Sequence, residues 1–250
     1  MVDVDKMLNL AIDVAKQAGE RLQKISQRTI NSQEGHDVKL QEDIESEKFI
    51  GSLLEKSGIP IIGEELSGNL SLAENNEYYW IVDPIDGTYN FLRGYPVVCV
   101  SIALMKGMDS IVGVVYDFIR DELFAGAKSH PLTINGVAIK PNWAKEKSQA
   151  MLMTGFPSAT TFEDEAMQEF VTCVRSYKKV RMCGSAAIAA AYVACGRADT
   201  YFENKTNLWD VAAGMALAES AGAYLFVENA NIAGKPLSLN IKISADKNFL

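Results

Sequence analysis

The stretch WIVDPIDGTYNF places two aspartates, Asp83 and Asp86, directly after an apolar run that begins at Trp80. Pro84 fixes its own φ angle and Gly87 permits backbone conformations that most residues resist, so a turn here can bring both carboxylates to one point. Two carboxylates at the end of a buried strand repel each other, and they are costly to desolvate unless they are protonated, paired or bound to a cation. The pair therefore predicts a site for a divalent metal ion.

The groups around the two aspartates suit a hard metal ion and a phosphate. Oxygen ligands favour Mg²⁺ or Mn²⁺ over zinc or copper, and the backbone carbonyl of Ile85 can add one more oxygen. Gly87 and Thr88 can offer backbone N–H groups to a phosphate at the start of a helix. An ordinary surface turn is the alternative, because Asp, Pro and Gly all favour turns for conformational reasons alone.

Two further segments also place carboxylates at the ends of apolar elements. Glu64 and Glu65 follow the apolar run in IIGEEL, where alternation should point one side chain inward and the other aside. Asp210 stands at the start of the predicted helix in LWDVAAG, where a helix N-cap is the ordinary role. Three separated acidic segments together favour a metal site over a surface turn.

Other kinds of catalytic centre lack the residues that they need. His36 and His130 are the only histidines, which excludes a His-Glu-x-x-His metalloprotease helix and a multi-histidine oxidase site. The motifs G-x-S-x-G, G-x-x-x-x-G-K and G-x-G-x-x-G do not occur, so a hydrolase elbow, a nucleotide loop and a dinucleotide fingerprint have no support. Carboxylates remain as the chemical equipment of the chain.

Composition predicts a globular, cytoplasmic protein. The chain has 250 residues, of which 48% are hydrophobic, and a formal charge of −8 that argues against a sequence-independent grip on nucleic acid. No secretory signal and no apolar run of membrane-spanning length stands out, so no membrane partner is expected. None of the four cysteines forms a C-x-x-C pair, and buried thiols in a reducing compartment are expected for Cys99, Cys173, Cys183 and Cys195.

The apolar pattern predicts a mixed α/β (α+β) fold. Helical spacing indicates one helix near residues 3–26 and a second near residues 44–54, with a polar, solvent-exposed connection between them over residues 26–43. Short apolar runs rich in Val, Ile and aromatic residues then indicate a sheet. From about Thr160 helices and strands alternate, which predicts layers of helix and sheet. We place a boundary between two halves near Ala144, giving residues 1–143 and 144–250.

Three motifs carry a resemblance to a known family. WIVDPIDGTYNF resembles the signature W-x-x-D-P-I-D-G-T-x-N-F of the inositol monophosphatases, WDVAAGMALAESAGA is similar to their second signature, and GEE matches their upstream glutamate motif. Because the order and the separations also agree, the resemblance extends over nearly the whole chain. It implies a layered αβαβα sandwich of the sugar-phosphatase type and a Mg²⁺-dependent, lithium-sensitive phosphomonoesterase.

The resemblance implies ligands for two Mg²⁺ ions, with Mn²⁺ as an expected substitute. Glu64, Asp83 and the carbonyl of Ile85 resemble the ligands of the first ion. Asp83, Asp86 and Asp210 resemble those of the second.

The resemblance also implies catalytic roles. Asp43 is similar to an aspartate that hydrogen-bonds the signature threonine, here Thr88, and this pair would help to orient or deprotonate water. Glu64 joins them in the implied catalytic set, while Glu65 resembles a supporting acid outside the ligand shell.

The segment RMCGSAA resembles the part of the family that faces the substrate, and Glu203 matches a glutamate that binds a polyol hydroxyl. An ordinary helix start and a solvated strand end are the alternatives for these two features. The implied substrate-binding residues are Asp86, Gly87, Thr88, Gly184, Ser185, Ala186, Glu203 and Asp210.

The chain departs from the family pattern at several positions. Lys39 and Leu40 replace the usual Val-Thr, which leaves open a third metal ion at that loop. Ala189 stands where a polar residue is frequent, which weakens any inference about the preferred sugar. Ser220 and Ala223 are small changes in the second signature.

The resemblance implies hydrolysis of inositol monophosphate to inositol and phosphate by metal-activated water. A related phosphatase is the alternative, acting on fructose 1,6-bisphosphate, histidinol phosphate or adenosine 3′,5′-bisphosphate. The alternative from a different functional class is a non-catalytic regulator that binds phosphates, because a fold does not guarantee activity. The expected partner is a small phosphorylated polyol or sugar, and the resemblance implies a homodimer.

Overall fold

The computed structural model describes residues 2–35, 37–65, 75, 77–157, 160, 162–230 and 237–249. His36, which the sequence leaves without a catalytic role, lies outside these ranges. Within them, no helix is both long and apolar enough to cross a membrane.

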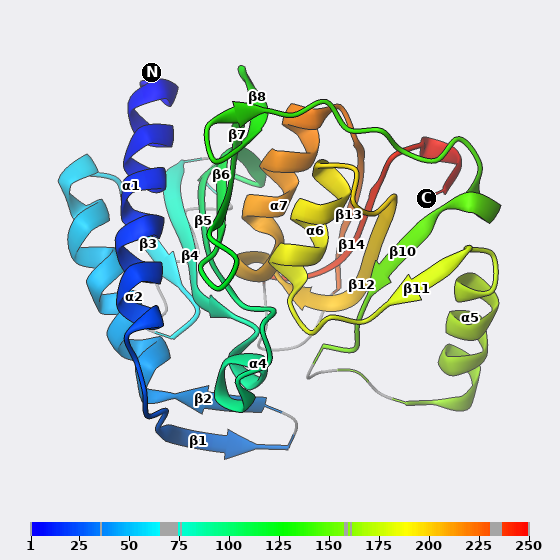
Figure 1. Cartoon of the computed structure of the whole chain (residues 1–250), viewed down its shortest axis with the longest axis horizontal. Helices are drawn as coiled ribbons and strands as arrows, with labels where there is room; N and C mark the ends of the chain where they lie inside the picture. Colours follow the sequence, from blue (N-terminus) through cyan, green and yellow to red (C-terminus); the bar gives the residue numbers. More distant parts are fainter. Residues whose placement is uncertain are drawn as a thin grey trace.

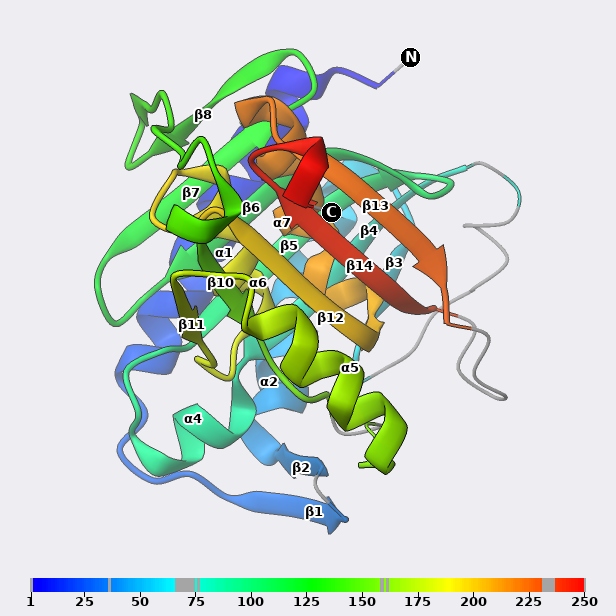
Figure 2. The same ribbon diagram turned by 90° about the vertical axis from the view of Figure 1, so that its right-hand side faces the viewer.

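Helices and sheets alternate across the molecule in layers (Figure 1). From left to right in that view they are a helix pair, a first sheet, a second helix pair, a second sheet and a single helix, and Figure 2 shows this last helix in front of the second sheet. The layers confirm the predicted αβαβα sandwich. The helices in chain order are α1 (Val4–Gln23), α2 (Gln41–Leu54), α4 (Thr88–Arg93), α5 (Asp164–Val174), α6 (Ala186–Ala194) and α7 (Leu208–Ala221), with short 3₁₀ turns η1 (Glu55–Ser57), η2 (Lys147–Gln149) and η3 (Lys247–Phe249).

The first sheet has the strand order β3-β4-β5-β6-β7-β8-β9. Its first pair, β3 with β4, is parallel, and every later pair is antiparallel. Parallel pairing brings the carboxyl ends of β3 and β4 to the same edge, where both acidic motifs begin. Its strands are β3 (Ile61–Gly63), β4 (Tyr78–Asp86), β5 (Cys99–Lys106), β6 (Asp109–Asp117), β7 (Glu122–Ala127), β8 (His130–Ile134) and β9 (Val137–Ala138).

The second sheet has the order β11-β10-β12-β14-β13 and mixes parallel and antiparallel pairs. Its strands come from the chain after Ala144, and those of the first sheet come from the chain before it. The helix α7 nevertheless contacts strands of both sheets, so the division into two halves stays a prediction. The strands are β10 (Met151–Thr154), β11 (Lys179–Arg181), β12 (Thr200–Asn207), β13 (Tyr224–Asn229) and β14 (Ser238–Ser244).

The polar segment between α1 and α2 is not only a connection. It forms an antiparallel hairpin of β1 (Ile30–Glu34) and β2 (Asp37–Leu40), which the sequence analysis did not predict. Val38 and Leu40 are buried in the core that α1 and α2 share with the first sheet. Two apolar anchors among polar residues are too few to give a strand period, although they hold β2 in place.

The outer helix α1 shows why its residues form a helix. The side chain of Asp3 caps its first turn by accepting a hydrogen bond from the backbone N–H of Lys6 at 3.1 Å. Ala11, Ala15 and Ala18 form a buried stripe of small side chains, which lets α1 approach the first sheet closely.

The central helix α7 lies so close to the first sheet that one strand residue must be glycine. A Cβ at Gly113 in β6 would stand 2.2 Å from the carbonyl oxygen of Ala213 and 2.9 Å from the Cβ of Ala216. Ser110, also in β6, donates a hydrogen bond to the carbonyl of Ala212 at 2.7 Å. This contact holds α7 and therefore sets where Asp210, in its first turn, lies.

Gly113→Ala is expected to lower the free energy of unfolding by about 3 kcal/mol, because the obstructing oxygen belongs to helix backbone and moves only with α7. Urea unfolding measures the change. Gly51→Ala in α2 is the matched control, since its added Cβ would meet only the Ile61 Cδ1 atom at 4.0 Å, and it should leave stability equal or slightly higher. Equal stability of both variants would contradict this account of the contact.

Candidate metal and phosphate site

The carboxyl end of β4 is acidic and buried. Asp83 and Asp86 are 2% and 6% exposed, and the register of β4 on β5 shifts between them. The Oδ1 atom of Asp83 accepts a hydrogen bond from the backbone N–H of Ile85 at 3.0 Å. Burial, and next to it the charge of Glu64, raises the pKa of Asp83 well above its ordinary value. The surface-turn alternative for this motif is therefore excluded.

Asp86 is held by the first turn of α6. Ser185, the N-cap residue, donates its hydroxyl to Asp86 Oδ2, and the backbone N–H groups of Ala187 and Ala186 donate at 2.8 and 3.3 Å. Burial raises the pKa of Asp86, while these donors oppose that shift. The sequence predicted a helix start here, but it did not predict that this helix start would donate hydrogen bonds to Asp86. Ser185 and Ala186 stay predicted substrate residues whose donors already serve Asp86.

A side chain that sequence reasoning left without a structural role joins α4 to the segment before α6. Asn90 Nδ2 donates to the carbonyl oxygens of Val97 and Cys183, each at 2.8 Å, and lies 3.2 Å from that of Gly184. Asn90 therefore positions the predicted substrate segment beside the signature that contains Asp86.

Thr88 and Asp43 are not hydrogen-bonded to each other as the resemblance implied. Thr88 Oγ1 donates to the carbonyl of Ile85 at 3.0 Å, and Asp43 Oδ2 accepts from the backbone N–H of Leu40 at 2.7 Å. A hydroxyl has one proton to give, and the nearby backbone acceptor takes it. Burial raises the pKa of Asp43 to about 7.

Glu64 and Glu65 lie in a turn beyond β3, so the predicted alternation of a strand does not apply to them. Glu64 is half-buried, and burial followed by the charges of Asp210 and Asp43 raises its pKa well above the ordinary value. Glu65 forms an ion pair with Lys39 at 3.0 Å. The charge of Lys39, which departs from the family pattern, also opposes the rise in the pKa of Glu64 and of Asp43, so Lys39 lies beside the acidic group.

Asp210 occupies the third position of α7 and is not its N-cap, which is Asn207. Its Oδ2 atom accepts the backbone N–H of Asn207 at 2.9 Å and the hydroxyl of Thr206 at 3.0 Å. Burial, and next to it the charge of Asp86, raises the pKa of Asp210 to about 7. The first turn of α7 therefore brings a third carboxylate towards Asp83 and Asp86.

Glu203 lies in the middle of β12, and its carboxylate lies against Gly155, which directly follows β10. A Cβ at Gly155 would stand 2.4 Å from Glu203 Oε1, so a side chain there would push the carboxylate aside. Burial, and next to it the charge of Asp210, raises the pKa of Glu203 to about 8. Tyr201 shares its face of β12, and its buried hydroxyl lies close enough to the Glu203 carboxylate to oppose this rise in its pKa.

These carboxylates are electrostatically linked, because the charge of Asp86 raises the pKa of Asp210, the charge of Asp210 raises the pKa of Glu64 and Glu203, and the charge of Glu64 raises the pKa of Asp83. Within the described ranges, however, no three acidic, histidine or cysteine side chains lie close enough together to enclose a metal ion. Asp43, Asp86 and Asp210 instead each accept hydrogen bonds from backbone N–H groups. The all-oxygen donor set fits a hard divalent cation, which would relieve a repulsion that the nearby Lys39 offsets only in part.

Fold and sequence comparisons define the class of the protein. A solved structure of the suppressor protein SuhB from Bartonella henselae aligns over 98% of this chain and 95% of its own, with a TM-score of 0.83 and 27% identity. The inositol monophosphatase of Anabaena aligns over 97% and 92%, with a TM-score of 0.80 and 32% identity. This chain therefore has the fold of the inositol monophosphatases.

The sequence model of the family described as "Inositol monophosphatase family" matches residues 3–243, and the chain belongs to that family. An inositol monophosphatase of Mesembryanthemum crystallinum is 35% identical over 90% of this chain and 86% of its own length. A protein named Nus factor SuhB, from Xylella fastidiosa, is 35% identical over 87% and 80%. The chain is an enzyme of the phosphomonoester hydrolase class.

Proposed function

We propose that the protein hydrolyses a small phosphate monoester in a Mg²⁺-dependent reaction, with inositol monophosphate as the first candidate substrate. The observation that carries the proposal is the group of carboxylates, drawn from four separate segments, whose pKa values are raised by burial and by one another. Relatives named inositol monophosphatase support the choice of substrate.

The residues that would hold two metal ions are Glu64, Asp83, the carbonyl of Ile85, Asp86 and Asp210. Bound there, Mg²⁺ or Mn²⁺ would supply positive charge to a water molecule and to the oxygens of the phosphate. The carboxylates themselves exclude other anions from the site when it holds no cation, because repulsion between like charges raises the energy of any added anion. The binding of a third metal ion near Lys39 stays a prediction.

The remaining residues would bind and orient the phosphate ester. The backbone N–H groups of Gly87 and Thr88 would hold phosphate oxygens at the beginning of α4. Asp43, whose pKa is raised to about 7, would accept a proton near neutral pH, while the hydroxyl of Thr88 would act apart from it, beside the Ile85 carbonyl. Glu203 would accept a hydrogen bond from a hydroxyl of the alcohol, and Gly184, Ser185 and Ala186 would face the same group.

A panel of phosphate esters tests the proposal. Phosphate release is measured for inositol 1-phosphate, fructose 1,6-bisphosphate, histidinol phosphate and adenosine 3′,5′-bisphosphate, each with Mg²⁺ and with EDTA. We expect Mg²⁺-dependent turnover with the highest kcat/KM for inositol 1-phosphate. A higher kcat/KM for another ester would assign the alternative substrate, and tight binding of the phosphates without metal or turnover would favour the regulator.

Relatives named Nus factor are a reason to test for a non-catalytic role as well. The formal charge of −8 argues against a phosphate-directed grip on RNA, so the lack of a nucleic acid partner stays a prediction. The cytoplasmic location and the homodimer are proposals of the same standing.

A further inference from the structure

A pocket lies on the α5 side of the second sheet, beside the proposed site and unused by it. Phe156, Met167, Phe170 and Phe202 form its apolar walls, and Asn204 and Lys205 line it with polar groups. Ligand pockets typically combine apolar walls with a few polar groups of this kind.

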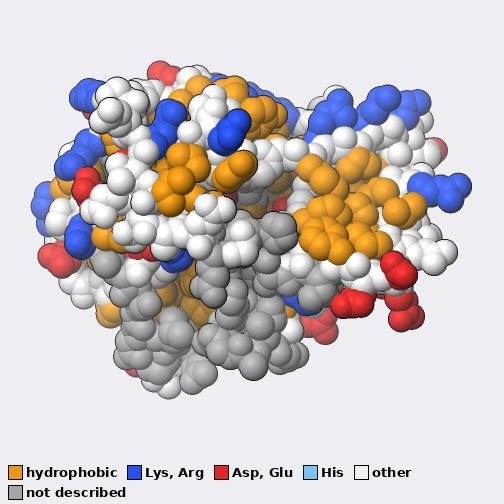
Figure 3. Space-filling model, turned by 90° about the horizontal axis from the view of Figure 1, so that it is seen from below, with side chains coloured by type: hydrophobic (Ala, Val, Ile, Leu, Met, Phe, Trp, Pro, Cys, Tyr) orange, Lys and Arg blue, Asp and Glu red, His pale blue; other side chains and the backbone are white. Residues whose placement is uncertain are grey.

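The aromatic rings of this pocket are unusually accessible. The Phe156 ring lies 4.8 Å from that of Phe170, which lies 6.0 Å from that of Phe202. Phe156 is 39% exposed, and Phe162, 5.2 Å from it, is 56% exposed. Seen from below, hydrophobic side chains gather on the right, on the side of α5 (Figure 3). Exposed clustered rings are costly in water and mark a binding surface.

One glycine separates the pocket from the predicted alcohol site. Gly155 lines the pocket, and its backbone also lies against the carboxylate of Glu203. Phe202 and Glu203 are neighbours on β12 that point to opposite faces of the sheet. Gly155, a residue without a side chain, therefore borders both the pocket and the carboxylate that is predicted to hold the alcohol.

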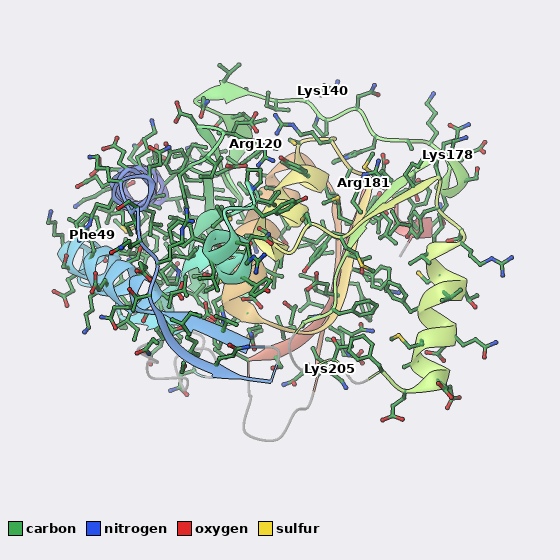
Figure 4. All side chains as sticks on the ribbon, turned by 60° about the horizontal axis from the view of Figure 1, so that its bottom comes forward. Phe49, Arg120, Lys140, Lys178, Arg181 and Lys205 are labelled. Carbon is green, nitrogen blue, oxygen red and sulfur yellow. The ribbon has the colours of Figure 1, made fainter. Side chains whose placement is uncertain are left out.

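The backbone is strained at Lys205, one of the residues that line the pocket. Lys205 has a φ of +64°, in a region that residues other than glycine seldom adopt, and the register of β12 on β14 shifts between Glu203 and Thr206. Figure 4 shows Lys205 between α5 and the β1–β2 hairpin. Backbone strain of this kind persists mainly where a site requires it.

We propose that this pocket binds a planar aromatic ring in the alcohol part of a second group of substrates, so that the enzyme accepts phosphate esters that carry such a ring in addition to inositol monophosphate. The inference rests on the proposed phosphatase function and refines its substrate class. Rings with polar edges suit the pocket best, because Asn204 and Lys205 stand beside the phenylalanines.

The test compares 2-naphthyl phosphate with glycerol 2-phosphate in the wild-type protein, in Phe156→Ala and in Phe226→Ala, all with Mg²⁺. Phe226 is a matched control because it is an exposed phenylalanine on β13, outside the pocket lining. Each ester is compared between variants, so the intrinsic reactivity of its leaving group cancels. We expect the ratio of kcat/KM for the two esters to fall about tenfold in Phe156→Ala, mainly through KM, and to stay unchanged in Phe226→Ala. Phe156→Tyr should retain the wild-type ratio.

An unchanged ratio in Phe156→Ala, with glycerol 2-phosphate still hydrolysed, would overturn the inference and leave the phosphatase function intact. A changed oligomeric mass with an unchanged ratio would instead assign the rings to an interface between copies and likewise overturn it. If no variant hydrolysed any ester, the phosphatase function would fail. Calorimetry with Mg²⁺ would then test whether the pocket binds a ring. The proposal is supported if the wild-type protein binds the naphthyl ester more tightly than the glycerol ester and Phe156→Ala loses this difference. It is rejected if the two esters bind equally.

Discussion

Replacing Asp83 by Asn is expected to lower Mg²⁺-dependent kcat/KM by about a thousandfold. Asp83 is the one side chain predicted to serve both metal ions, and it lies buried at the end of β4. The variant should still fold, because the amide oxygen of the introduced asparagine can accept the Ile85 N–H as the carboxylate of Asp83 does. It should also be at least as stable as the wild type in EDTA, since one source of repulsion is gone. Phosphate release and urea unfolding measure the two effects.

Asp199→Asn is the matched control for this loss of one negative charge. Asp199 accepts the backbone N–H groups of Ala144 at 2.6 Å and Met151 at 2.7 Å, and it directly precedes β12. We expect it to lower the free energy of unfolding by about 1–3 kcal/mol and to leave kcat/KM within about twofold. Activity that survived in Asp83→Asn would show that the ions, or the chemistry, do not depend on this carboxylate.

Removing metal with EDTA is expected to lower the Tm more at pH 8 than at pH 6. The pKa values of Asp43, Asp210 and Glu203 are raised to about 7, 7 and 8 in the metal-free protein. In the unfolded chain these groups ionise near pH 4, so the unfolded state releases protons that the folded state retains. The metal-free protein therefore loses stability as pH rises from about 4 to 8, and the loss is complete above the folded-state pKa values.

Bound metal reverses this trend, because a cation binds the ionised carboxylates and releases their protons. Saturating Mg²⁺ should raise the Tm by about 5–10 °C at pH 8 and by less at pH 6. Differential scanning calorimetry at both pH values checks the difference. Asp83→Asn should lose most of the Mg²⁺-dependent shift, and an EDTA effect that was larger at pH 6 would contradict the raised pKa values.

Much of the fold could be read from local patterns. The helical period of α1 and the apolar run before Asp83 are patterns of residue type along the chain. They can therefore be recognised without knowing the tertiary contacts. The hairpin β1–β2 escaped prediction because only Val38 and Leu40 anchor it, and their burial depends on helices that pack above them.

The amino-acid sequence alone was enough for most of the order of helices and strands, the acidic character of the site and the family, since these depend on residue types and spacing along the chain. The partners of each side chain came from packing between distant segments. Asp86 meets α6, and Thr88 donates to the Ile85 carbonyl and not to Asp43. Hydrogen bonds depend on distances of a few tenths of an ångström, which spacing along the chain does not specify and which the packed layers do.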